Sequence, residues 1–246
     1  MNDQTPIERA KESSKADRGI GWRQVLRFAV FIFLLPAAAL FVSSGRLDWG
    51  MAWAFAGLTV FFTVVSRLLA LKKNPDLLVE RARSLDTEDA ARWDRALFPF
   101  VAMVGPLVTL VVAGLDRRFG WSPRLALPLQ WAALAVVALA YCLATWAMAV
   151  NRFFSAVVRI QKDRGHTVVN SGPYRIVRHP AYAAGLGSQL AAPLMLGSWW
   201  ALVPAVLTAA LVVVRTALED RTLLEELDGY VDYACQVRYR LVPGLW

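Results

Sequence analysis

The sequence predicts an all-α integral membrane protein with about six membrane-embedded helices. Three observations support this fold class. Hydrophobic residues make up 57% of the 246 residues, and the mean hydropathy of +0.42 is too high for an ordinary soluble domain. Uncharged runs of 18 to 36 residues recur along the chain. Lysine and arginine residues gather between alternate runs, as expected for the loops on one side of a membrane.

Five uncharged runs define the spans, because about 20 apolar residues cross a hydrocarbon core roughly 30 Å thick. The last run would reach about 54 Å as one helix, which is enough for two arms. Gly197-Ser198 near its middle predicts the tip of a helical hairpin, and Pro193 and Pro204 predict that both arms are short. The runs are Phe28–Gly45, Trp49–Ser66, Leu97–Leu115, Leu125–Asn151 and His179–Val214.

The distribution of cations predicts the orientation. With six crossings both termini lie on one side, and that side holds 23 of the 27 Lys and Arg residues. The positive-inside rule therefore predicts a multi-pass protein of the inner (cytoplasmic) membrane with both termini in the cytoplasm. The net charge of +8 follows from this bias and needs no nucleic-acid partner. The remaining cations are Arg46, Arg117, Arg118 and Arg124.

Three regions are expected along the chain. Residues 1–23 are charged and lack an apolar period, so we expect a disordered cytoplasmic arm. Residues 24–150 form a four-span membrane region with a cytoplasmic loop at 72–96, in which 76–83 and 89–96 are candidates for short interfacial helices. Residues 151–246 carry most of the chemistry, in a turn, the helical hairpin and a cytoplasmic C-terminal helix.

The stretch GPYRIVRHPAY, residues 172–182, is the first candidate site. A Gly-Pro and a His-Pro pair stiffen it, and its second proline suits the first position of a helix. The turn presents Arg175, Arg178 and His179 beside the free N–H groups and partial positive charge of a helix N-terminus. This combination predicts a site for a carboxylate or phosphate. The alternative, a basic loop that only meets lipid headgroups, is preferred for Arg175.

A second candidate site lies where the last span leaves the membrane, in RTALEDRTLLEEL, residues 215–227. Arg215 and Glu219 are four residues apart and share one helical face. Glu219 lies within about a turn of the membrane edge, where a charge is costly without a partner. We expect Arg178 to be that partner. The alternative, a solvated amphipathic face, is preferred for Glu225 and Glu226.

Other polar residues carry weaker signals. Asn151 at the end of the fourth span, Arg215 and Tyr233 are candidate acceptor-binding residues, although a tyrosine here is also typical of plain interfacial packing. His166 lies in a polar stretch and is expected to be exposed. The two cysteines have no ligand spacing and the two histidines lie apart, so we expect no metal site.

The motif SGPYRIVRHPAY, the acidic pair at 219–220 and the ending YVDYACQVRYRLVPGLW resemble membrane methyltransferases related to isoprenylcysteine carboxyl methyltransferase and phospholipid methyltransferases. Upstream, NPDLLVERAR and RWDRAL are similar to bacterial members, so the resemblance covers about 74–246. It implies that Arg178 and Glu219 are catalytic, and that Asp220 replaces the second glutamate of the family's acidic pair. The residues that it places in a cofactor pocket are Gly172, Pro173, Tyr174, Arg178, His179, Pro180, Tyr182 and Glu219.

The resemblance implies an S-adenosylmethionine-dependent methyltransferase that acts on a lipid or lipid-like acceptor in the bilayer, through a carboxylate, an amine or a thiol. Two other functions stay open at this point. One is an NADPH-dependent, sterol-reductase-like membrane enzyme, which shares the His-Pro-x-Tyr turn. The other is a membrane scaffold without enzymatic activity. The sequence does not predict an oligomeric state.

Overall fold

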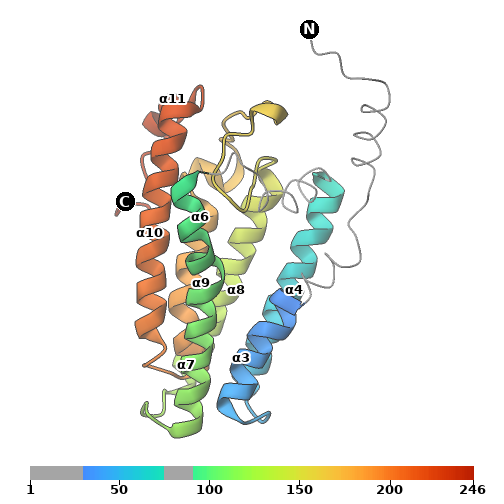
Figure 1. Cartoon of the computed structure of the whole chain (residues 1–246), viewed down its shortest axis with the longest axis vertical. Coiled ribbons are helices and arrows are strands. Elements are labelled where there is room, and N and C mark those ends of the chain that lie inside the picture. Colours follow the sequence, from blue (N-terminus) through green and yellow to red (C-terminus); the bar gives the residue numbers. More distant parts are fainter. Residues whose placement is uncertain (1–29, 75–90) are drawn as a thin grey trace.

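The computed structural model describes residues 30–74 and 91–246. The described chain is helical and contains no β-strand. Figure 1 shows a bundle of long, roughly aligned helices, with α3 and α4 together on one side and α7, α9 and α10 on the other. The elements are η1 (Val30–Leu34), α3 (Leu35–Ser44), α4 (Gly50–Lys73), α6 (Arg92–Pro99), η2 (Phe100–Val104), α7 (Gly105–Phe119), α8 (Leu127–Val150), η3 (Lys162–Arg164), η4 (Gly172–Arg175), α9 (Pro180–Leu196), α10 (Leu202–Glu226) and α11 (Tyr230–Gln236).

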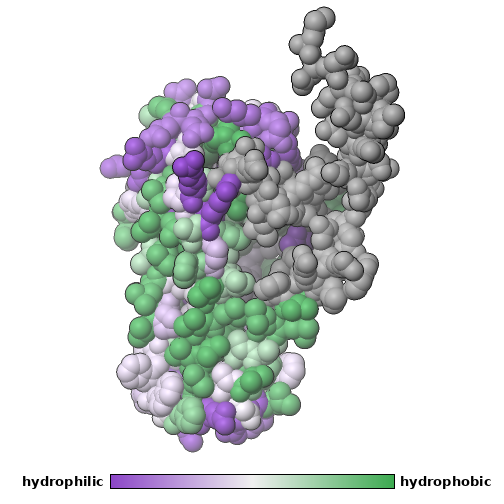
Figure 2. Space-filling view, in the orientation of Figure 1, coloured by the Kyte–Doolittle hydropathy of each residue, from purple (hydrophilic) through white to green (hydrophobic). Residues whose placement is uncertain are grey.

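The predicted fold class is confirmed. Among the described residues, four helices are long and apolar enough to cross a membrane: α4, the continuous helix Arg92–Phe119, α8 and α10. The first and fifth predicted spans also contain helices, α3 and α9, but these two helices are shorter. Figure 2 shows a hydrophobic band between two hydrophilic ends, as a bilayer requires. The count of six crossings and the orientation stay predictions.

The predicted hairpin tip is confirmed, but one arm differs from the prediction. The helix α9 ends at Gly197, whose φ of 78° is the left-handed conformation that glycine adopts at a helix end. The second arm, α10, is 25 residues long rather than short. It continues past Val214 through the charged segment to Glu226 because Arg215 and Asp220, which would be costly at this depth, are both buried against partners of opposite charge.

The interior of the bundle is built from small and branched side chains. The helix α8 packs most extensively against α9, and α3 packs against α7. Buried alanines on these helices let the backbones approach closely, as is usual for helix pairs in membranes. Large apolar side chains such as Leu139 and Leu207 are instead exposed, which fits contact with lipid. The buried core contains Leu40, Trp49, Phe55, Leu110, Val137, Met195 and Leu196.

The segment before the third span is a correction to the sequence prediction. The structure shows no separate interfacial helix at 91–96, since α6 runs on through η2 into α7. The π-helical turn η2 lies between Pro99 and Pro106, which lack the N–H groups that a regular helix would use. The predicted arm at 1–23 and the predicted helix at 76–83 lie outside the described residues.

Candidate active site

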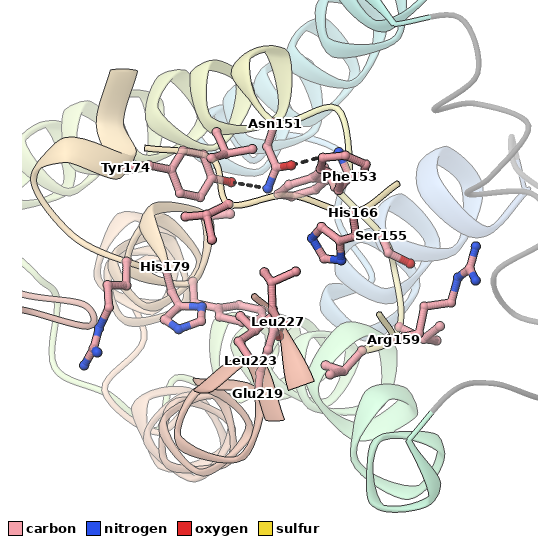
Figure 3. A pocket seen from close by; sticks show the side chains of 18 of the residues that line it. Asn151, Phe153, Ser155, Arg159, His166, Tyr174, His179, Glu219, Leu223 and Leu227 are labelled. Carbon is pink, nitrogen blue, oxygen red and sulfur yellow. Dashed lines mark hydrogen bonds between the residues drawn. The ribbon is translucent and has the colours of Figure 1, made fainter. Parts of the chain in front are cut away.

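A cavity of about 520 Å³ lies at the end of the bundle that carries α11 and the irregular segment 151–171. Its volume is within the usual range for small-molecule sites. The walls come from α6, η2, α8, the 151–169 segment, η4 and the adjoining turn, α9, α10 and α11. Figure 3 shows that Tyr174, His166, His179 and Glu219 surround one space although they come from different elements.

Most of the residues predicted for the site line this cavity. The three that do not line it are Gly172, Pro173 and Pro180. A Cβ on Gly172 would lie 3.0 Å from a Val150 side-chain carbon, so glycine lets the η4 turn approach the end of α8. The predicted residues that line the cavity are Asn151, Tyr174, Arg178, His179, Tyr182, Arg215, Glu219 and Tyr233. Their roles stay predictions.

Asp220 is the centre of the cationic cluster beside the cavity. Its side chain is fully buried. One carboxylate oxygen lies 3.1 Å from His179 Nε2 and accepts a 2.9 Å hydrogen bond from the Tyr230 hydroxyl. The other accepts a 2.7 Å bond from Arg240 Nε and lies 3.3 Å from Arg178 Nη2. Two guanidinium groups share this carboxylate, so the cluster keeps a net positive charge.

This geometry corrects the predicted partner of Arg178. The guanidinium pairs with Asp220, not with the neighbouring Glu219. Glu219 instead accepts a 2.5 Å hydrogen bond from the Tyr182 hydroxyl. No salt bridge to Glu219 is present among the described residues. Adjacent helical positions point in different directions, which is why one acid faces the cluster and the other faces the cavity.

The C-terminal tail holds the Arg-His-Pro turn by its backbone. The N–H of Arg178 donates a 2.9 Å hydrogen bond to the carbonyl of Tyr239, and the N–H of His179 donates one of the same length to the carbonyl of Arg240. The side chain of Arg240 then reaches Asp220. Turn, tail and α10 therefore fix one another, and the turn is rigid for a reason beyond its prolines.

Three hydrogen-bonded side chains form the wall opposite α10. The Tyr174 hydroxyl accepts a 3.1 Å bond from Asn151 Nδ2, drawn in Figure 3. The Tyr233 hydroxyl donates a 2.7 Å bond to the carbonyl of Tyr174. Burial raises the pKa of both phenols above the ordinary value. They are therefore neutral groups that shape the cavity and do not act as bases near neutral pH.

A buried ion pair ties α6 to α10. Asp94 is fully buried, and its two oxygens accept bonds of 2.6 and 3.1 Å from Arg215. Arg215 also donates to the carbonyl of Ala156, and Asp94 accepts the N–H of Val158. The sequence offered no reason to select Asp94, because its side-chain partners Val158 and Arg215 lie 64 and 121 positions away. Its only local signal was an acid beside Trp93, close to the predicted membrane edge.

His166 was expected to be exposed, and this was wrong. It lines the cavity, packs 4.5 Å from the Phe153 ring, and accepts a long backbone hydrogen bond at Nδ1 from Gln161. Burial, together with the positive charges of Arg159 and Arg164, lowers its pKa from the ordinary 6.5 to about 4. His166 is therefore a neutral imidazole at neutral pH.

Two buried polar atoms in the described chain lack any hydrogen-bond partner: Arg178 Nε and Ser155 Oγ. Both residues line the cavity. Native proteins rarely leave such atoms unsatisfied, and a ligand is one of the usual reasons. The cavity thus combines a cationic cluster that has an unused donor, the Glu219 carboxylate, which forms no salt bridge in the described chain, and apolar walls. That set is complementary to a zwitterionic molecule with an apolar part.

Part of the chain that forms this cavity is similar to a known protein family. The model of the isoprenylcysteine carboxyl methyltransferase (ICMT) family matches residues 132–225, from α8 to the last turn of α10. The matched segment is similar to the ICMT family and covers less than half of the 246 residues. Proteins of this family are S-adenosylmethionine-dependent methyltransferases, so the predicted resemblance and the predicted enzyme class are confirmed. The ICMT match does not favour the reductase or the scaffold. A comparison with curated proteins gives no match.

The ICMT segment contains only part of the cavity. It includes Arg178, His179, Glu219 and Asp220, and it ends before Tyr230, Tyr233 and Arg240. Asp94 lies upstream of it. The cavity is therefore completed by the C-terminal tail and by α6, outside the matched residues.

Proposed function

We propose that the protein transfers the methyl group of S-adenosylmethionine to the carboxylate of a lipid-like acceptor in the membrane. The observation that carries this proposal is the pairing of opposite charges in one cavity. The Asp220 cluster presents Arg178 with an unused donor, and Glu219 has no salt-bridge partner among the described residues. The amino-acid end of S-adenosylmethionine carries a carboxylate and an ammonium group, which match these two features.

The residues present fit the cofactor in three respects. Arg178 and His179 would hold its carboxylate, and Glu219, fixed by Tyr182, would hold its ammonium group. The apolar wall of Val157, Val168, Leu223 and Leu227 suits an adenosine ring system. Ser155 Oγ supplies a further hydrogen-bonding group that has no partner within the described chain.

The bound cofactor supplies an activated methyl group on sulfur, whose carbon–sulfur bond breaks as the acceptor's bond to the same carbon forms. The protein has to place the acceptor in line with that bond and exclude water, so positioning accounts for most of the catalysis. The buried Asp220 cluster and the Asp94–Arg215 pair give the cavity the rigidity that this requires.

A carboxylate acceptor is favoured over an amine or a thiol by the side chains in the cavity. A carboxylate is already a nucleophile and needs no base. Arg215 lines the cavity and uses Nε and Nη2 for Asp94 and Ala156, which leaves its Nη1 donors for an anion. A protonated amine or a thiol would need a base, whereas His179 is bound to Asp220 and His166 is a weak base.

An apolar groove beside the main cavity supports a lipid-like acceptor. A groove of about 210 Å³ lies between α4 and α8 and is lined by Phe62, Tyr141 and Met148. It shares Ala144 and Phe154 with the main cavity. An apolar chain in this groove would extend toward the bilayer while its polar end reaches the cavity. This route lets the acceptor enter from lipid and the cofactor from water.

The test is methyl transfer from isotopically labelled S-adenosylmethionine into a membrane lipid extract, with the purified protein in detergent. The product class follows from mild alkaline treatment, because a methyl ester releases labelled methanol and an N-methyl or S-methyl product does not. We expect alkali-labile label with wild type. Glu219→Gln should reduce the label at least tenfold, and Glu225→Gln, an exposed control on the same helix, should not. Alkali-stable label would exclude the carboxylate acceptor but keep the methyltransferase.

A further inference from the structure

A second large cavity lies at the opposite end of the bundle from the candidate active site. Its volume is about 670 Å³. Its walls come from the start of α4, the end of α7, the 120–127 segment, the start of α8 and the end of α9. No residue that lines it lines the candidate active site, so the proposed methyl transfer does not use it.

This second cavity carries an excess of positive charge. Three of the four arginines that the sequence places at this end line it: Arg46, Arg117 and Arg124. Arg46 is paired with Asp48 at 2.7 Å. Arg117 and Arg124 have no salt bridge within the described chain. These two arginines and the one carboxylate among the described lining residues give the cavity a net charge of about +1. One phosphodiester would neutralise this charge.

The N-terminus of a helix adds to the positive charge of this cavity. Gly50 and Met51, the first residues of the 24-residue helix α4, line the same cavity. Their backbone N–H groups have no acceptor within the helix, and Trp49 provides no side-chain cap. The partial positive charge of the helix end therefore faces the space between the arginines.

The lining carboxylate belongs to Asp116, and its oxygens are already occupied. One accepts the N–H of Ser122 at 2.7 Å. The other accepts the hydroxyl groups of Ser122 and Ser198. Ser122 Oγ in turn accepts the N–H of Trp199 at 2.9 Å. This network fixes the 120–127 segment, and hence the backbone that carries Arg124, to α7 and to the turn between α9 and α10.

The floor of the cavity is apolar. Met51, Leu125 and Leu196 line it, together with the buried Trp49 and the exposed Trp131. Tryptophan is enriched at the level of lipid headgroups, where one part of the ring meets acyl chains and the other meets water. A rigid cationic rim over an apolar floor at this depth matches the phosphate and upper acyl chains of a phospholipid, and does not match a small soluble anion.

We propose that this cavity binds an anionic phospholipid of the leaflet opposite the candidate active site. The phosphodiester lies between Arg117, Arg124 and the N-terminus of α4, and the acyl chains run past Trp131. Because the site holds the ends of α4, α7, α8 and α9 together, the lipid stabilises that end of the bundle. An anionic headgroup is preferred over a zwitterionic one, since the latter brings a cation toward the same arginines.

The test uses the purified full-length protein in detergent, titrated with short-chain phosphatidylglycerol or phosphatidylcholine and followed by native mass spectrometry and melting temperature. We expect phosphatidylglycerol to bind more tightly and to raise the melting temperature more. Each basic residue near a lipid surface contributes about 1 kcal/mol, so Arg117→Ala and Arg124→Ala should each weaken phosphatidylglycerol about fivefold. Arg124→Lys should retain most of the binding.

Arg118→Ala is the matched control. Arg118 has the same charge at the same end, but it lies over the Phe119 ring and against Gly45, and does not line the cavity. It should bind phosphatidylglycerol like wild type. Equal losses in Arg118→Ala and Arg124→Ala, equal binding of the two lipids, or displacement of phosphatidylglycerol by millimolar inorganic phosphate would each overturn the proposal. Binding of S-adenosylmethionine should be unchanged in all these variants, so the outcome is independent of the proposed methyl transfer.

Discussion

Glu219 and Asp220 are adjacent acids with different tasks. Asp220 is fully buried and holds two arginines, a histidine and a tyrosine, whereas Glu219 accepts a hydrogen bond from Tyr182 and lines the cavity. The sequence identified the pair and its depth. The sequence prediction chose Glu219 as the partner of Arg178, and this was wrong. Two adjacent residues cannot be distinguished by their position in the chain, because the choice depends on how α10 is rotated against α9.

We predict that substitutions of the two acids differ in their effect on stability. Asp220→Asn leaves buried guanidinium charge uncompensated, which typically costs about 3–5 kcal/mol of stability, and it should also weaken S-adenosylmethionine. Glu219→Gln should keep the melting temperature of wild type and lose cofactor affinity. Thermal denaturation and calorimetry on the same samples separate these effects. A stable Asp220→Asn protein with normal affinity would show that the cluster has no structural role.

His166 provides a prediction on pH. Its folded-state pKa of about 4 lies below the ordinary value of 6.5, because burial and Arg159 and Arg164 disfavour the imidazolium. Its contribution to stability is therefore complete above pH 6.5 and is lost as the pH falls from 6.5 toward 4. His166→Gln should flatten this part of the melting-temperature profile. Parallel profiles for the variant and wild type over that interval would contradict the assignment.

At the level of elements, uncharged runs located the six helices because bilayer thickness constrains length and composition together. They failed at the end of α10, where the chain continues as a helix through charged residues. Charges at that depth depend on partners distant in sequence, Asp94 for Arg215 and the Arg-His-Pro turn for Asp220. A pattern within one segment holds no information about such pairs.

The Asp94–Arg215 pair can be tested as a link between α6 and α10. Removing either partner alone leaves a buried charge and should destabilise the protein by about 3–5 kcal/mol. The double variant Asp94→Leu/Arg215→Met should lose less than the sum of the two single losses, because no charge is then left unpaired. The exposed pair Arg221–Glu225 on the same helix is the control, and its removal should leave the melting temperature close to that of wild type. Additive losses at Asp94 and Arg215 would refute the coupling.

At the scale of the whole molecule, the two ends of the bundle differ. The end with the candidate active site holds α11, the tail and the irregular 151–171 segment, and the other end holds short turns and the second cavity. The sequence predicted this asymmetry from the distribution of Lys and Arg. It could not predict the cavities themselves, since a hollow depends on how side chains from several helices meet.

The same charge bias predicts the orientation of the bundle. Reporter fusions after Trp246 and at Gly120 should lie on opposite sides of the membrane, with the C-terminal fusion in the cytoplasm. The predicted orientation would place the candidate active site on the cytoplasmic side, where S-adenosylmethionine is available. Fusions that report the same side would show that the chain crosses the membrane differently from the six-span prediction.

The central claim is that the cavity between the Arg-His-Pro turn and α10 binds S-adenosylmethionine, and calorimetry on the purified protein in detergent tests it most directly. We expect saturable binding of S-adenosylmethionine and none of NADPH. Arg178→Ala should lose at least about 30-fold in affinity, since it removes one partner of a buried charge pair. Arg175→Ala, an exposed arginine of the same turn, should lose less than about tenfold. Binding of NADPH alone, or wild-type affinity in Arg178→Ala, would contradict the account.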